Sequence, residues 1–445
     1  MSKRYSLVFA GLGILCAVWP AAAWEHHPLI TWHVVETMPQ IGGAAPARAV
    51  PLQEFLIAEE AGLADLLAVH EAWAKSNLRW YAACPDVLAF KVTGNPNDVC
   101  NRFFRAIRVN PAIKTPLYTT RLAGQEFGGK NVLPPDAVSI LSNTSMLEAF
   151  VFEELQPGEL VHPVDIVSGA SNEPDYGMDV GLFSDNGTSI GRVFGFGAQP
   201  FGNPNLDYGS QAPFHMGFFH ESPIIYLFAG FLKQSFVEYR IHLFKALSEY
   251  AFSKGQDYWG WRFMGWGLHY IGDLAMPYHT TVLPRYSTLH MLWINLLDMI
   301  GLSKYKNNAV QLVSNRHMAL ELFQGFTMAD ACRNNDFTNP SIAALRRERT
   351  VPVYADDLPR NALAKASHGL SAKIDKAVEN YMPAHFVKNP AVELANCPNR
   401  FNVVEMVQAE HGDAAIETIA RLQAEALDLF GTYGRSYALA IVNSR

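Results

Sequence analysis

Runs of basic residues are absent from the 445-residue chain, in which 35 Lys and Arg stand against 42 Asp and Glu. Without its first 23 residues, which carry two of the basic ones, the chain has 33 basic and 42 acidic residues, a formal net charge of −9. A protein that binds a polyanion usually gathers Lys and Arg on one surface. The composition therefore argues against nucleic acid as a partner, although a local patch can oppose the net charge.

The apolar run at the amino terminus, residues 7–18, is too short to span a bilayer, and no basic stop follows it. Lys3 and Arg4 precede this run, and the small residues of segment 20–23 follow it. This order is typical of an export signal peptide. We therefore expect cleavage before Trp24 and a secreted or periplasmic protein.

Cysteine is scarce: the chain has five, of which one lies in the predicted signal peptide. The other four are Cys84, Cys100, Cys332 and Cys397, an even number in a chain that we expect to reach an oxidising compartment. We predict disulfides between neighbours, Cys84 with Cys100 and Cys332 with Cys397. Other pairings, or four buried thiols, are the alternatives.

Alternating patterns typical of strands are also scarce, and apolar residues recur instead at helical spacing. Nothing resembles a repeat or a flexible linker. The sequence therefore predicts an all-α protein, in which residues 134–212, rich in Gly, Asp, Asn, Pro and Ser, form mainly loop. Ser222 and Pro223 look like a cap and a first-turn proline, and Pro277 should end a helix. Helices are predicted over residues 52–80, 223–252, 257–276, 289–302, 361–381 and 403–442.

The segment 269–279, HYIGDLAMPYH, carries the strongest local signal of a site. His269 and Asp273 are four residues apart, which puts both side chains on one face of a helix. The proline at 277 then turns His279 back towards the same region, and His290 follows on the next predicted helix. Imidazole and carboxylate are ligands that zinc accepts. The segment therefore predicts a metal site, the alternative being an ordinary buried His–Asp pair.

This segment resembles the signature of the bacterial zinc-dependent phospholipase C family, whose superfamily also contains zinc-dependent single-strand nucleases. The resemblance implies a multi-helix bundle with long loop insertions and roughly two to three zinc ions. It also implies that the mature amino-terminal tryptophan, here Trp24, binds a metal through its α-amine and carbonyl oxygen. Because a terminal amine exists only after cleavage, processing and activation would be one event.

The resemblance extends to two segments nearer the amino terminus. HPLIT, which begins at His27, is similar to the family's first metal-binding histidine and the helix that it opens, with His26 and His33 as substitutes. The segment GASNEPD, which ends at Asp175, is similar to the place where the family has an acidic residue. By this similarity Asp175 is a metal ligand and the general base, and Asp179 is the alternative.

Another family histidine precedes the long helix that leads to the signature, and here His215 and His220 compete for the role. Five residues apart, they would point about 140° away from each other on a regular helix. We therefore expect only one of them to bind the metal from such a helix, and the other to be structural.

At His290 the chain departs from the family pattern. The family has an acidic residue four positions later, where this chain has Ile294, which cannot bind zinc. Either Asn295 or Asp298 replaces it, or this metal is bound more weakly. The other histidines have no neighbouring ligand pattern and are expected on the surface or in the core: His70, His162, His242, His317, His368, His385 and His411.

The resemblance also implies how the ligands divide among the metals. His269, Asp273, Asp175 and one of His215 and His220 would hold one metal, His279 and His290 a second, and Trp24, His27 and Asp273 a third. Zinc would lower the pKa of a bound water, Asp175 would take its proton, and hydroxide would attack phosphorus in line.

The expected activity is that of a phospholipase C, which releases diacylglycerol and a phosphorylated headgroup at a membrane surface. Residues 24–300 would form the catalytic domain and residues 301–445 a helical extension packed on it. Segments 173–176 and 271–273 look like the phospholipase branch, and Tyr176 would hold a choline cation by cation–π attraction unless it only anchors its loop. The alternatives are a zinc-dependent single-strand nuclease or nucleotidase, and a non-enzymatic exported protein stabilised by zinc.

Overall fold

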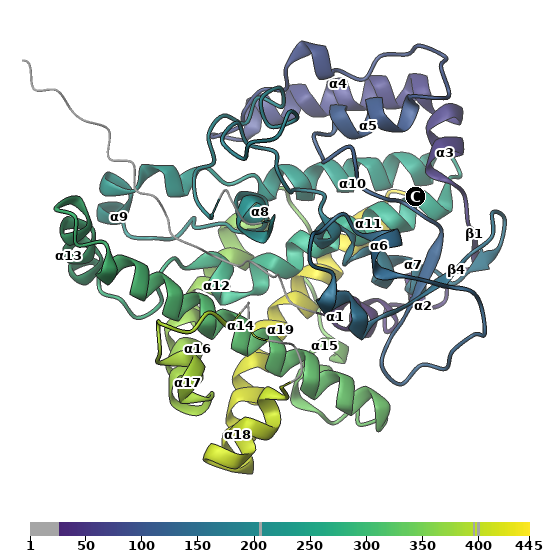
Figure 1. The fold of residues 1–445 in the computed structure, drawn as a ribbon. Helices are drawn as coiled ribbons and strands as arrows, with labels where there is room; N and C mark the ends of the chain where they lie inside the picture. The colour runs from purple at the N-terminus through teal and green to yellow at the C-terminus, as the bar shows by residue number, and fades with distance from the viewer. Residues whose placement is uncertain (1–25, 204–206, 395–396, 398–400) are drawn as a thin grey trace, which may run out of the picture.

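Helices form most of the computed structural model, which describes residues 26–203, 207–394, 397 and 401–445 (Figure 1). This confirms the prediction that helices dominate the chain. The predicted signal peptide and Trp24 lie outside the described residues. None of the helices in these ranges is long and apolar enough to cross a membrane.

The core is built around α11 (Asp257–Ala275), which is buried at every position from Tyr258 to its end. A helix that is apolar on all sides must be covered on all sides. Four helices pack against α11 or its neighbours: α1 (His27–Val35), α7 (Pro163–Ala170), α10 (Val237–Ser253) and α19 (Asp413–Val442). In Figure 1 α11 and the yellow α19 cross near the middle of the molecule.

Two glycines let the neighbouring elements approach α11 closely. A Cβ on Gly265 would lie 2.5 Å from the backbone oxygen of Val167 in α7. A Cβ on Gly267 would lie 1.8 Å from the hydroxyl oxygen of Tyr437 in α19. Since neither position has room for a side chain, glycine fixes how near α7 and α19 lie to the central helix.

Proline and serine act at helix ends as predicted, but one helix is shorter than expected. The helix α11 ends at Ala275, before Pro277 begins α12 (Pro277–Thr280). The Ser222 hydroxyl caps α9 (Pro223–Phe228) by accepting from the Ile225 amide. The predicted helix 223–252 is nevertheless broken. A 3₁₀ turn (Gly230–Lys233) follows α9, and α10 starts only at Val237, because the Phe236 amide donates to Pro213 in α8 (Asp207–His215) instead.

The region 134–212, predicted as mainly loop, contains more structure than expected. It supplies α7, the 3₁₀ turn η3 (Glu173–Tyr176) and the strands β4 (Val151–Glu154) and β5 (Leu160–Val161). Strand β4 lies between β2 (Tyr118–Arg121) and β3 (Val132–Leu133) in an antiparallel sheet, and β5 pairs with β1 (Ala47–Arg48). Long-range pairing forms these strands, and the strands are too short to show an alternating pattern.

The predicted helix 52–80 is divided at Glu59 into α3 and α4, and the remaining helices agree with the predicted segments or fall between them. Residues after 301 pack on the rest of the molecule: α14 contacts α13, α16 contacts α12, and α19 contacts α11. Within the predicted segment 403–442, Gly412 (φ +76°) separates α18 from α19. The bounds not yet given are α2 (Pro39–Gly42), α3 (Leu52–Ala58), α4 (Glu60–Asn77), α5 (Val99–Ala106), α6 (Pro135–Val138), α13 (Thr288–Met299), α14 (Lys304–Arg333), α15 (Pro340–Arg346), α16 (Lys365–Tyr381), α17 (Ala384–Val387) and α18 (Val403–His411).

The predicted disulfides are not formed. All four described cysteines are free thiols, and three have partners of their own. The Cys84 thiol faces the backbone oxygens of Pro85 and Ala106, Cys332 Sγ lies 3.3 Å from Nε2 of His33, and the Cys397 thiol faces the backbone oxygen of Glu393. Pairing neighbours along the sequence was wrong because a disulfide requires specific distances in space, which sequence order does not give.

Candidate metal centre

The central helix places His269 and Asp273 one turn apart on one buried face. The imidazole Nε2 of His269 lies 3.3 Å from Oδ2 of Asp273. On its other side, Nδ1 of His269 donates to the backbone oxygen of Ser171, at 2.8 Å. Because this hydrogen bond fixes the ring and its tautomer, Nε2 is left as an acceptor that faces the carboxylate.

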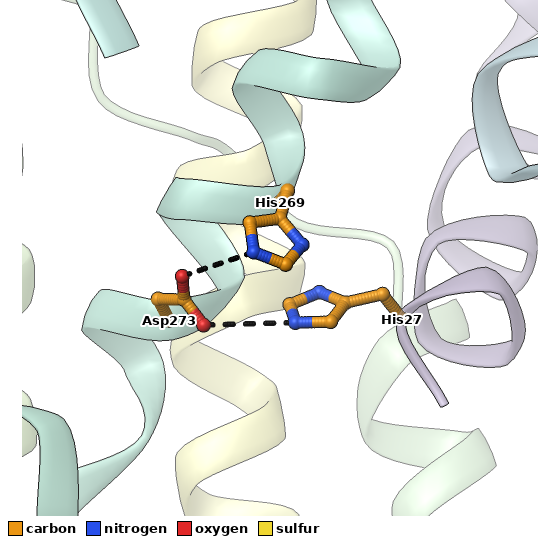
Figure 2. Close-up of side chains that lie close together, drawn as sticks. All are labelled: His27, His269 and Asp273. Carbon is orange, nitrogen blue, oxygen red and sulfur yellow. Dashed lines mark ion pairs between the residues drawn. The ribbon is translucent and has the colours of Figure 1, made fainter. Parts of the chain in front are cut away.

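The amino-terminal helix adds His27 to this pair. Its Nε2 lies 3.6 Å from Oδ1 of Asp273, so the two imidazoles face opposite oxygens of one carboxylate, as Figure 2 shows. Gly272 leaves room for this approach, since a Cβ there would lie 3.0 Å from Cε1 of His27. We call His27, His269 and Asp273 the central group; their ligand atoms lie within 4.8 Å of one another.

A second group shares His269 and consists of Asp175, His215 and His269. Asp175 lies on η3, and His215 ends α8. Nδ1 of His215 lies 3.0 Å from Nε2 of His269 and 3.7 Å from Oδ1 of Asp175. The Asp175 side chain is 13% exposed, whereas those of His215 and His269 are at most 1% exposed. Burial raises the pKa of the Asp175 carboxyl.

Asp179, the alternative to Asp175 in the sequence, orients His215 from behind. Its Oδ2 accepts from the Tyr270 hydroxyl at 2.6 Å and lies 3.4 Å from Nε2 of His215, while its Oδ1 accepts from Nε of Arg240 at 3.0 Å. Burial alone would lower the pKa of His215, but Asp273 and Asp179 raise it to about 10. Asp179 therefore turns Nδ1 of His215 towards the shared carboxylate of Asp273.

A buried ion pair fixes the segment that carries Asp175. The Glu173 carboxylate accepts from Nη2 of Arg262 at 2.8 Å, from the Trp266 indole at 2.5 Å and from the Tyr118 hydroxyl at 2.8 Å. Both donors on the central helix lie one or two turns before His269. This network holds η3 against α11, so that Asp175 and His269 keep one relative position.

A third group, His279, His317 and Glu321, joins α12 to α14. We call it the Glu321 group. Nδ1 of His279 lies 3.4 Å from Oδ1 of Asp273, which links this group to the central one. Nε2 of His317 lies 2.7 Å from Oε1 of Glu321, and the His279 and His317 rings are 4.9 Å apart. Sequence reasoning missed both α14 residues. The signal was present, because His and Glu four residues apart share one helix face.

The structure does not bring His290 into any of the three groups. His290 is exposed on α13, where its ring lies against Tyr286. Its expected substitute ligands have other partners, since Asn295 donates to the Met291 carbonyl and Asp298 pairs with Lys306. A histidine followed four positions later by an acidic residue is instead found in the Glu321 group, at His317 and Glu321.

Three further histidines named as alternatives lie away from the groups. Nε2 of His220 donates to the backbone oxygen of Arg360 at 2.7 Å. Nε2 of His33 faces the Cys332 thiol, and His26 packs edge-on against Phe150. Of the residues that competed in the sequence, it is therefore His27 and His215 whose imidazoles face the shared carboxylate.

Tyr176 faces the protein interior and offers no surface to a substrate. It is 3% exposed, and its ring packs edge-on against Phe152 of the antiparallel sheet. Its hydroxyl accepts from the Asn172 amide at 3.2 Å. These contacts are those of a loop anchor, the alternative considered for this residue.

The donor set fits a metal ion. Among the described residues, these groups contain many of the buried polar atoms with no hydrogen-bond partner: both nitrogens of His27, His279 and His317, and both oxygens of Asp273 and Glu321. His317 and Glu321 approach closely, but in a geometry that makes no hydrogen bond. Leaving so many buried polar atoms unpaired is costly. Since imidazole and carboxylate are ligands that zinc accepts, bound cations would satisfy these atoms.

Comparison with protein-family models, with curated proteins and with solved structures found no match to the chain. The geometry of the three groups and the motifs of the sequence are therefore the whole basis for assigning a function.

Proposed function

We propose that the protein is a zinc-dependent hydrolase of phosphodiester bonds, and that phospholipid is its substrate. The observation that carries this proposal is the convergence of imidazole and carboxylate groups from α1, η3, α8, α11, α12 and α14, most of them buried and several without a hydrogen-bond partner. The central group, the group of Asp175 with His215, and the Glu321 group would hold zinc. By resemblance to the phospholipase C family, the amine of Trp24 would complete the site near His27.

Zinc bound at these groups would supply Lewis acidity to phosphoryl oxygens and a water of lowered pKa. Asp175 is suited to act as general base, because it is the most exposed carboxylate of the groups and burial raises its pKa. Nε2 of Gln211 donates to Oδ1 of Asp175 at 3.2 Å and fixes the carboxylate. Asp175 would accept the proton of the attacking water, which then displaces diacylglycerol from phosphorus.

The choice of phospholipid over nucleic acid rests on the sequence. Segments 173–176 and 271–273 look like the phospholipase branch, and the mature chain is acidic. A polyanion is bound mainly through Lys and Arg.

Metal analysis of the processed protein, beside a substrate panel, tests the proposal. We expect bound zinc and hydrolysis of phosphatidylcholine, and expect Asp273→Asn to lose both, with hydrolysis reduced at least about a hundredfold. Asp273 is the variant of choice because four histidines face its carboxylate, each from a different helix: His27, His215, His269 and His279. Asp86→Asn, at an exposed position far along the chain from Asp273, is the matched control and should change neither bound zinc nor hydrolysis.

The panel also separates the rival functions. Hydrolysis of single-stranded DNA without hydrolysis of phosphatidylcholine would replace the phospholipase proposal by the nuclease one. Tightly bound zinc that is lost from Asp273→Asn, with no hydrolysis of either substrate by the native protein, would favour a structural role for the metal. Normal zinc content in Asp273→Asn would refute the assigned site.

A further inference from the structure

The solvent-facing sides of α9 and α13 are apolar and lie next to each other. The two helices contact one another, and the hydroxyls of Ser222 and Thr288 at their first turns are 3.3 Å apart. Figure 1 shows both helices together at the left edge of the molecule, away from α4 and α18. Neither helix covers the exposed side of the other.

The exposed side chains of α13 follow one helical stripe. Leu289 is 78% exposed, Trp293 58% and Leu296 49%, at spacings of four and three residues. Met299 continues the stripe, and the neighbouring α9 exposes Leu227 and Phe228. We call these six residues the apolar patch. A group of exposed apolar side chains on neighbouring helices marks an interaction site, whereas single exposed apolar residues do not.

The two acidic side chains in or next to α9 and α13 are paired or buried, and a lysine follows each of the two helices. Asp298 of α13 pairs with Lys306, and the buried Glu221 accepts from the Val282 amide at 2.8 Å. Lys304, just after α13, is exposed, and the ammonium of Lys233 lies 4.5 Å from the Tyr226 ring. An apolar surface bordered by Lys is complementary to a bilayer, in which acyl chains lie beneath phosphate groups.

We propose that the apolar patch docks the protein onto the surface of a phospholipid bilayer. Trp293 stands at the middle of the stripe, and tryptophan is the side chain most typical of the membrane–water interface. The helix α13 would lie in the plane of the interface with its stripe among the acyl chains and Lys304 at the phosphates. This deepens the proposed function and rests on it for the identity of the lipid as substrate.

Short segments connect the apolar patch to the metal ligands. Residues 216–222 lead from His215 to α9, and residues 281–287 lead from α12, which contains His279, to α13. The two paths are tied together where the Gly217 amide donates to the His279 carbonyl at 2.9 Å. The apolar patch is therefore joined by short segments to α8 and α12, the elements that carry His215 and His279, and a bilayer bound at the patch would lie near them.

Binding to phosphatidylcholine vesicles, measured by flotation, tests this proposal. We expect Leu289→Ser/Trp293→Ser to weaken vesicle binding at least about tenfold, because it removes the apolar area that enters the bilayer. Hydrolysis of dihexanoylphosphatidylcholine below its micellar concentration should be unchanged. Trp80→Ser/Val87→Ser removes a similar pair of exposed side chains elsewhere and should leave vesicle binding unchanged. The single variant Trp293→Lys should also weaken vesicle binding. Its circular dichroism spectrum should match that of the native protein, which excludes misfolding as the cause.

Several outcomes distinguish the two proposals. Vesicle binding by Leu289→Ser/Trp293→Ser equal to that of the native protein overturns the docking surface, even if the enzyme hydrolyses the soluble lipid. Absence of vesicle binding by the native protein also overturns it, as does a native dimer that this variant converts to monomers without affecting vesicle binding. Vesicle binding that depends on the apolar patch, without hydrolysis of any phospholipid, supports the docking surface and refutes the phospholipase proposal.

Discussion

His317 and Glu321 lie on consecutive turns of α14, and both face His279 across a helix boundary. Their nitrogens and oxygens are buried and unpaired, so each would gain a partner only from a ligand. His290, which the sequence favoured, has an exposed side chain and lies against a tyrosine. The difference between the two histidines lies four positions further along the chain, where His317 is followed by Glu321 and His290 by Ile294.

We expect different results when His317 and His290 are replaced one at a time. His317→Gln should lower bound zinc by about one ion per chain and hydrolysis by at least about tenfold, because Gln keeps the volume but not the imidazole ligand. His290→Gln should leave both quantities unchanged. Zinc per chain, measured by mass spectrometry of the purified variants, checks both. A loss of zinc in His290→Gln alone would restore the assignment made from the sequence.

The contact between α7 and α11 depends on a single missing side chain. Gly265→Ala should lower the free energy of unfolding by about 1–3 kcal/mol, because its Cβ would meet the Val167 carbonyl and the backbone cannot move aside. The same shift would move Ser171, which holds the His269 ring. Gly369→Ala, at a helical position with nothing within 4 Å, should instead stabilise by about 0.5–1 kcal/mol.

Urea unfolding of both glycine variants measures this difference in sign. Equal effects on stability would show that α7 does not lie as close to α11 as the structure has it. A loss of stability in Gly265→Ala without any change in zinc affinity would show that the packing of α7 and the position of His269 are independent.

Between α4 and α10, a stack of aromatic rings makes the fold sensitive to acid. His242 stacks on Trp73 with ring centroids 3.3 Å apart, next to the buried His70. Burial and Lys245 lower the pKa of His242 to about 4, and burial lowers that of His70 to about 3. Since the unfolded chain takes up these protons near pH 6.5 and the folded chain does not, stability should fall as the pH falls below 6.5.

Replacing His242 should therefore flatten the dependence of stability on pH. Between pH 7 and pH 5, His242→Gln should remove about 2 kcal/mol from the loss of unfolding free energy. The measurement is urea unfolding in the presence of EDTA, so that release of metal makes no contribution. His385→Gln, which removes an exposed histidine, should keep the native slope. An unchanged slope in His242→Gln would place the sensitivity at other groups.

For the molecule as a whole, the sequence predicted what depends on neighbours along the chain. Apolar residues at helical spacing in segments 52–80 and 289–302 correspond to helices, α3 and α4 in the first segment and α13 in the second. The spacing of His269 and Asp273 likewise put both side chains on one face, since helix geometry is local. The all-α fold class and the pairing of His269 with Asp273 could therefore be predicted without knowledge of any distant contact.

What the sequence could not give depends on distant contacts. The helix predicted over residues 223–252 breaks after Phe228, and α10 starts only at Val237, where the Phe236 amide donates to the distant Pro213 carbonyl. The free thiols reflect distances that no spacing reveals. His317 is recognisable as a candidate ligand only together with Glu321, one turn further along α14, and His279 of α12. Which ligand-like pairs face each other is decided only when α11, α12 and α14 pack together.

Removal of metal should loosen the molecule unevenly. The three groups join helices from α1 to α14, whereas α4 and α5 contribute no residue to them. If zinc is present at about a thousandfold above its dissociation constant, EDTA should lower the free energy of unfolding by about 4 kcal/mol. Hydrogen exchange should then rise in α1 and α14, which would lose the ions that tie them to Asp273 and His279, and stay constant in α4. Uniform protection in all three helices after zinc has been removed would contradict the shared metal centre, because the ligands would then be held in place by packing alone.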